Sequence, residues 1–129
     1  MIEVRDLDER EMFRFYGGRL FLPMKGYAAR CRSRTVAVGG LMMGTDGQVW
    51  GFMDQRPGFR LKALYRYTLK LLDWAREKKI PEIRVSRDTG FDTSERLLMR
   101  AGFERSGEEI EGHEIWVWRN KKVQKNVRN

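Results

Sequence analysis

The stretch "LLDWAREKKIPEIRV", residues 71–85, contains the end of one helix, a break and one strand, and it sets the frame for the rest of the chain. Apolar side chains recur here at intervals of three and four residues, and the same spacing reaches back to Leu61. This spacing predicts an amphipathic helix from about Leu61 to Lys79, which "KKIP" ends. Residues 82–86, "EIRVS", then predict a short strand. A strand that follows a helix in this way is typical of a crossover connection in a sheet.

The residues before this helix predict an antiparallel meander over residues 27–54. The segment "TVAVGGLMMG", residues 35–44, is apolar on both faces, as a central strand is. "TDG" at 45–47 is a hairpin-turn signal, and "QVWGFM" at 48–53 is the returning strand. Further upstream, residues 1–6 predict a first strand. Asp8 and Glu11 form a capping-box pattern for a helix over Glu9–Tyr16.

The residues after the opening stretch predict one more helix and two more strands. The helix covers Ser94–Arg100 and ends at Gly102, a typical carboxyl-terminal cap. A strand starts at Phe103, "EEIEG" at 108–112 turns it, and residues 114–118 form the last strand, with both of its tryptophans on one face, either buried or waiting for a partner. The order strand, helix, three strands, helix, strand, helix, two strands predicts a mixed α/β sheet that is not doubly wound.

Length and composition argue against a disulfide-linked, zinc-binding, membrane or secreted protein. The chain has 129 residues, enough for one domain, and its 41% hydrophobic content favours a folded protein. Cys31 is the only cysteine and His113 the only histidine, so the sequence predicts neither an internal disulfide nor a zinc site. No apolar run approaches the ~20 residues of a membrane helix, and the polar start is not a secretory signal. We therefore expect no metal, no membrane association and a cytoplasmic setting in a bacterial cell.

The net charge of +8 comes mainly from the last eleven residues, "RNKKVQKNVRN". This segment, residues 119–129, holds five cations and no acid, which leaves +3 for residues 1–118. We expect a domain over 1–118 and a disordered, solvated tail over 119–129. The alternative is that the tail makes a weak contact with a nucleic acid, which added salt would weaken steeply.

Two further segments, "TSERLLMRAGFER" (93–105) and "GHEIWVW" (112–118), carry a family resemblance together with the opening stretch. The element order resembles the GCN5-related N-acetyltransferase (GNAT) fold, and Ala101-Gly102-Phe103 is similar to the end of the family's helix-to-strand passage. The chain also resembles small acetyltransferase-like proteins encoded by tailed phages and prophages. The resemblance implies an α/β domain with a central, mostly antiparallel sheet of six to seven strands, flanked by three to four helices.

The resemblance also implies a binding site for acetyl-CoA between the fourth and fifth strands. Main-chain groups of the fourth strand would pair with the pantetheine arm, and the loop in "QRPGFRLKALYR", residues 55–66, would hold the pyrophosphate at a helix amino terminus. The residues this assigns to the cofactor are Phe52, Met53, Arg56, Gly58, Phe59, Arg60, Leu61, Lys62 and Ala63.

This loop departs from the family pattern, because the first of the family's two small residues is absent and cations are frequent. One interpretation is that Arg56, Arg60 and Lys62 replace backbone N–H groups as phosphate contacts. The other is that they are ordinary solvent-facing cations at the start of a helix.

Catalytic residues are assigned by the same resemblance. Asp54 matches the family's carboxylate on the fourth strand, which would take the proton of an amine; alternatively it only starts the turn before "QRPG". The family's tyrosine acid falls on Leu98, which has no proton to donate. Tyr16, among the aromatic residues of the first helix and its loop, and His113 in the last turn would border the acceptor site. The alternatives are that Tyr16 belongs to the core and that His113 is an ordinary surface histidine.

Two functional hypotheses follow. The first is an acetyl-CoA-dependent N-acetyltransferase that acts on an amine. The second is a catalytically silent GNAT-like module, an accessory or virion protein of a phage or prophage, that acts by binding a protein partner. A homodimer is compatible with either.

Overall fold

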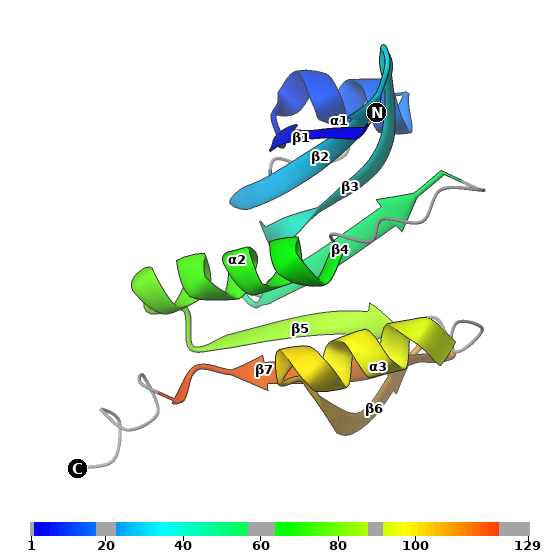
Figure 1. The fold of residues 1–129 in the computed structure, drawn as a ribbon. Helices are drawn as coiled ribbons and strands as arrows, with labels where there is room; N and C mark the ends of the chain where they lie inside the picture. Colours follow the sequence, from blue (N-terminus) through cyan, green and yellow to red (C-terminus); the bar gives the residue numbers. More distant parts are fainter. Residues whose placement is uncertain (1, 18–22, 57–63, 88–91, 122–129) are drawn as a thin grey trace.

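The computed structural model describes residues 2–17, 23–56, 64–87 and 92–121. The order of its elements is the order that the sequence predicts (Figure 1). The strands are β1 (Ile2–Asp6), β2 (Lys25–Cys31), β3 (Arg34–Met43), β4 (Val49–Gln55), β5 (Glu82–Arg87), β6 (Glu104–Ile110) and β7 (His113–Arg119). The helices are α1 (Glu9–Tyr16), α2 (Leu64–Glu77) and α3 (Asp92–Ala101).

All seven described strands form one sheet in the order β1-β2-β3-β4-β5-β7-β6. Each neighbouring pair is antiparallel except β4 and β5, which are parallel and joined through α2. The prediction of a mixed, mostly antiparallel α/β sheet is therefore confirmed, and the number of described strands is the upper one expected.

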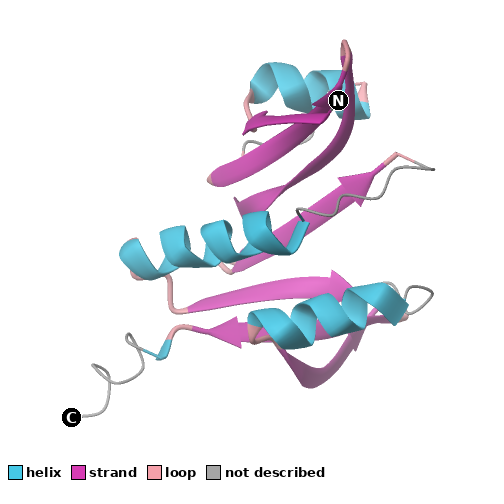
Figure 2. Ribbon diagram, in the orientation of Figure 1, coloured by secondary structure: helices cyan, strands magenta, loops and turns pink. Residues whose placement is uncertain are grey.

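The helices cover opposite faces of the sheet. α2 and α3 lie side by side on one face (Figure 2) and enclose the larger core, which includes Leu72, Ile83, Trp116 and Trp118. Both tryptophans are buried there. α1 packs on the other face, where Met12 is fully buried in a core that includes Ala28 of β2 and Val38 of β3. Burying one such side chain contributes about 1.5–3 kcal/mol.

Helix α1 has the amino-terminal cap that the sequence predicts and a left-handed glycine at its end. The carboxylate of Asp8 accepts a hydrogen bond from the backbone N–H of Glu11 (2.8 Å), and Gly17 ends the helix at φ 74°. An eight-residue helix is marginal on its own, so contacts with the sheet must hold it in place.

Glu11 provides one such contact from a buried position. Its side chain is only 2% exposed and accepts a hydrogen bond from the hydroxyl of Thr35 on β3. Guanidinium nitrogens of Arg14, Arg30 and Arg5 lie 3.0, 3.8 and 3.9 Å from Glu11 Oε1. The carboxylate is thus shared among α1, β1, β2 and β3. We call Glu11, Thr35 and the three arginines the Glu11 cluster.

Two turns show details that the sequence does not mark. The three strands of the predicted meander are present, and Arg32 takes a left-handed φ of 61° and closes a two-residue turn between the first two of them, β2 and β3. No glycine or asparagine marks that turn. In addition, "EEIEG" is not all turn: β6 continues to Ile110, with a register shift between Arg105 and Glu109 that places extra residues opposite β7.

The last strand also continues beyond the expected end of the domain at residue 118. β7 includes Arg119, and Asn120 is buried, with its backbone N–H donating to the carbonyl of Pro81 (2.8 Å). Residues 122–129, which form most of the basic tail, lie outside the described residues.

Candidate functional site

The candidate site begins where β4 and β5 separate. β4 pairs with β3 along its whole length, from Val49 to Gln55, but with β5 only from Val49 to Gly51. β5 remains paired with β7 as far as Arg87. The ladder between β4 and β5 therefore ends at Gly51 and Val85, and the two strands diverge toward their carboxyl ends (Figure 1).

Gly51 allows β4 and β5 to approach each other closely at the point from which they diverge. A β-carbon on Gly51 would lie 2.8 Å from Val85 Cγ1, closer than two such atoms normally come, so a side chain here would displace one of the strands. Beyond this point, an extended molecule with amide groups can pair with the edge of a strand as an added strand does. The edge of β4 that β5 leaves unpaired beyond Gly51 therefore suits an amide-containing ligand.

Asp54 lies three residues beyond Gly51 and is held by Tyr16. Side chains alternate between the faces of a strand, so Asp54 points to the face that α1 covers. The hydroxyl of Tyr16, at the end of α1, donates a hydrogen bond to Asp54 Oδ2. These two side chains were predicted separately, as a base and as a wall of the acceptor site, and the fold brings them into contact across 38 residues of sequence.

The environment of Tyr16 favours its protonated form. Partial burial, the hydrogen bond to Asp54 and the negative charge of that carboxylate raise the pKa of the Tyr16 hydroxyl above its ordinary range. Tyr16 is therefore a lasting hydrogen-bond donor to Asp54 and a poor proton donor to anything else. The described residues supply no hydrogen bond to Asp54 Oδ1, and Asp54 is exposed. One oxygen is thus fixed and the other can accept a proton from a bound molecule.

Arg56 is placed differently from the other residues expected at the pyrophosphate. Its Nη2 atom donates to the carbonyl of Phe15 (2.6 Å), and its guanidinium lies 4.6 Å from the centre of the Phe15 ring. The side chain therefore reaches back to the end of α1. As a phosphate contact, Arg56 remains a sequence prediction that this placement does not favour.

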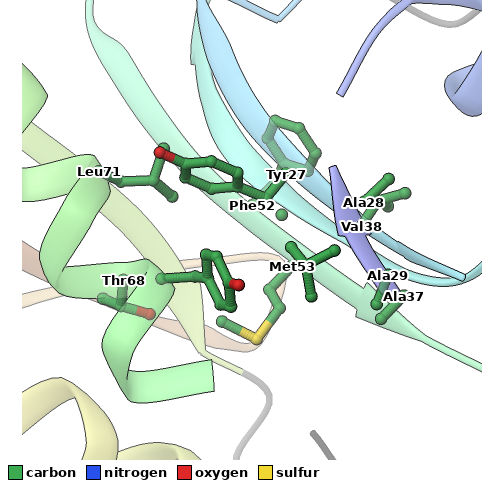
Figure 3. Close-up of a pocket in the computed structure, with 12 residues that line it drawn as sticks. Tyr27, Ala28, Ala29, Ala37, Val38, Phe52, Met53, Thr68 and Leu71 are labelled. Carbon is green, nitrogen blue, oxygen red and sulfur yellow. The ribbon is translucent and has the colours of Figure 1, made fainter. Parts of the chain in front are cut away.

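A small apolar groove lies beside β4 on the face that α2 covers (Figure 3). Met53 points into it from β4, Ala29 and Ala37 form its floor, and Thr68 and Leu71 border it from α2. Phe52 also contributes to its lining and packs mainly against the core under α1. Phe52 and Met53 thus lie on the strand that borders the divergence, where the sequence predicts pantetheine contacts.

Other residues considered from the sequence lie apart from Asp54. His113 is exposed at the start of β7, and the described residues give it no hydrogen bond or ion pair with Tyr16 or Asp54. Leu98 packs against the core between α2, α3 and the sheet. The Tyr65 hydroxyl donates to the carbonyl of Arg100 (3.2 Å), which ties α2 to α3.

Part of the predicted cofactor site lies outside the described residues. These positions are Gly58, Phe59, Arg60, Leu61, Lys62 and Ala63, and their assignments remain sequence predictions. Within the described ranges, no group of three or more histidine, cysteine or carboxylate side chains is arranged to hold a metal ion. In the same ranges, no helix has the length and apolar character needed to cross a membrane.

The architecture matches solved acetyltransferase structures. PaiA N-acetyltransferase from Thermoplasma acidophilum, solved in complex with coenzyme A, aligns over 92% of this chain and 99% of its own, with a TM-score of 0.63 and 14% identity. An acetyltransferase of the GNAT family from Staphylococcus aureus Mu50 aligns over 93% and 99%, with a TM-score of 0.64 and 11% identity.

A third structure is larger than this chain. Ribosomal-protein-S5-alanine acetyltransferase from Vibrio fischeri aligns with a TM-score of 0.61 and 13% identity, over 77% of this chain and 63% of its own. No protein-family model and no curated protein sequence matches the chain. At these identities the likeness concerns the fold alone. The chain therefore has the GCN5-related N-acetyltransferase fold.

Proposed function

We propose that this protein is an acetyl-CoA-dependent N-acetyltransferase that acts on an amine. The observation that carries the proposal is the position of Asp54, an exposed carboxylate held by Tyr16, just beyond the point where β4 and β5 diverge. A structure of the same fold, from Thermoplasma acidophilum, holds coenzyme A.

The residues present suit acetyl-CoA because the edge of β4 can form hydrogen bonds with its pantetheine arm. The pantetheine arm is narrow and contains amide groups, which match the edge of β4 beyond Gly51. Met53 and its neighbours on β4 would supply main-chain hydrogen bonds on that edge. The predicted cations Arg60 and Lys62 would lie near the pyrophosphate. When bound, acetyl-CoA would supply the thioester whose acetyl group is transferred.

Asp54 would act as the base. An amine is a nucleophile only after it loses its ammonium proton, and Asp54 Oδ1 would accept that proton while Tyr16 holds Oδ2. The new C–N bond would form as the thioester C–S bond breaks. Because Leu98 has no proton to donate and Tyr16 remains protonated, the departing thiolate would take its proton from water.

Replacement of the base tests this assignment. Asp54→Asn should lower kcat about 10²–10⁴-fold, the range for loss of a general base, while acetyl-CoA affinity stays within about two-fold. Rates would be measured with a panel of primary amines and affinity by calorimetry. Asp73→Asn, at an exposed carboxylate on α2, is the matched control and should leave both values unchanged. Equal rates in Asp54→Asn and the unmodified protein would contradict the role of Asp54.

The placement of Leu98 favours a second candidate function. Leu98, an apolar residue that packs against the core, stands where the resemblance implies a tyrosine acid. This is expected of a GNAT-like module that has no transfer activity and binds a protein partner, such as a phage or prophage accessory protein. This candidate predicts binding of acetyl-CoA without acetylation of any amine, or no binding at all.

A further inference from the structure

We propose that Arg56 is a positioning residue, which clamps the carboxyl end of α1 onto β4 and thereby keeps Tyr16 on Asp54. The effect on acetyl transfer rests on the function proposed above, whereas the clamp itself rests only on contacts within the chain. Arg56 would thus hold α1 in position and would not bind phosphate.

The contacts of Arg56 join two elements. Its backbone N–H donates to the carbonyl of Val36 (2.8 Å), which anchors the end of β4 to β3. Its side chain extends to α1, where Nη2 lies 2.6 Å from the Phe15 carbonyl and 3.4 Å from the Arg14 carbonyl. The last carbonyls of a helix lack partners within the helix and carry partial negative charge, so a guanidinium there is favourable.

A second interaction fixes the direction of the same side chain. The Arg56 guanidinium lies over the ring of Phe15, a buried residue, and that ring meets the Tyr16 ring edge-to-face at 4.9 Å. The Nε atom of Arg56 is buried as well. Its cationic group is thus engaged with α1.

The geometry connects this clamp to the proposed base. Arg56 directly follows β4 and lies two residues after Asp54, and both side chains contact the end of α1, where Phe15 and Tyr16 are adjacent. The pairs Arg56–Phe15 and Asp54–Tyr16 therefore join the same two elements side by side. Without the first pair, the last turn of so short a helix would fray and the second pair would weaken.

Among the residues that the structure describes, few charges other than that of Arg56 itself bear on the Tyr16–Asp54 pair. On α1, the guanidinium of Arg14 is directed to Glu11 (3.0 Å). On β3, the residue opposite Asp54 is the apolar Val38. Loss of the Arg56 cation would by itself raise the pKa of Tyr16, so only a shift down on replacement of Arg56 would report the state of the clamp and of Asp54.

Titration of Tyr16 tests the clamp without any ligand. Tyrosinate absorbance is followed against pH, and the Tyr16 contribution is the difference between each protein and its Tyr16→Phe counterpart. In the unmodified protein Tyr16 should ionise well above pH about 10, the ordinary value for a phenol. Arg56→Met should shift that ionisation down toward pH 10. Arg56→Lys should shift it less, because a lysine can still reach a carbonyl but cannot stack on the ring as a guanidinium does.

A control variant separates this effect from general loss of stability. Ile83→Val removes one methyl from the core on the opposite face, at a position far from α1 in the strand order. It should leave the ionisation of Tyr16 unchanged, with folding at each pH checked by circular dichroism. If Arg56→Met leaves Tyr16 ionising where it does in the unmodified protein, the positioning role is refuted.

Calorimetry with acetyl-CoA distinguishes the clamp from a phosphate contact. A positioning role predicts that Arg56→Met binds acetyl-CoA within about two-fold of the unmodified protein while kcat falls. A direct pyrophosphate contact predicts a loss of affinity of about ten-fold or more, the size of one charge-assisted hydrogen bond, and would overturn the proposal. If the unmodified protein binds no acetyl-CoA, the proposed function fails, and the titration of Tyr16 still decides the role of Arg56.

Discussion

Replacement of Glu11 by glutamine should destabilise the protein far more than loss of an ordinary surface carboxylate. The side chain is 2% exposed, so water solvates its negative charge poorly, and the arginines of the Glu11 cluster must balance that charge. Glutamine keeps the shape and can still accept from Thr35, but it removes the negative charge that three guanidiniums surround.

The expected size of the loss follows from the exposure of the partners. Breaking a buried ion pair by removing one member costs about 3–5 kcal/mol. Arg5 and Arg14 are 40% and 39% exposed and can turn to water, whereas Arg30 is 14% exposed and cannot do so easily. We therefore expect a loss of about 2–3 kcal/mol in the free energy of unfolding. For a domain of this size that lowers Tm by about 10 °C.

Urea unfolding followed by circular dichroism measures this loss directly. The midpoint should fall with the m-value unchanged, since the surface exposed on unfolding is the same. Asp73→Asn is the control: its single contact with Arg76 (2.8 Å) is exposed, and its loss should cost under about 0.5 kcal/mol. A loss below about 1 kcal/mol for Glu11→Gln, or one equal to the control, would refute the argument from burial.

Three further predictions concern the site itself. Because the pKa of Tyr16 is raised in the folded protein, the contribution of Tyr16 to stability is complete below pH about 10 and is lost as pH rises further. The difference in unfolding free energy between the unmodified protein and Tyr16→Phe should therefore shrink at alkaline pH. Gly51→Ala should cost about 1–3 kcal/mol in urea unfolding by clashing with Val85, and the double variant with Val85→Ala should recover part of that loss; an unchanged midpoint in Gly51→Ala would disprove the close approach. The double variant Arg60→Glu, Lys62→Glu should weaken acetyl-CoA binding about ten-fold or more by calorimetry, and unaltered affinity would remove these cations from the proposed pyrophosphate site.

Local patterns in the sequence predict most of the elements. Asp8 and Glu11 mark the start of α1, and Gly102, at φ 97°, ends α3 as the sequence predicts. Signals of this kind are readable because cap, turn and periodicity preferences act over a few neighbouring residues. The turn at Arg32 escapes such reading, since a left-handed arginine carries no sequence mark.

The candidate site is only partly predictable from the sequence, because its contacts join residues that are far apart along the chain. The resemblance points to Asp54 and Tyr16 one at a time, but their contact and the reach of Arg56 to Phe15 join positions about forty residues apart. The capping pattern likewise identifies Glu11 but does not reveal that its side chain is buried against Thr35. Contacts of this kind depend on which strand pairs beside which, and single-sequence patterns carry no such information.

The central claim is that acetyl-CoA binds between β4 and β5 beyond Gly51. Amide chemical shifts of the protein, recorded by NMR during titration with acetyl-CoA, test this claim most directly. The account predicts saturable changes centred on Met53, Asp54 and Gln55 of β4 and on Ser86 and Arg87 of β5, where the two strands diverge. Saturation with no change at these five amides, or no change anywhere at millimolar ligand, would contradict it.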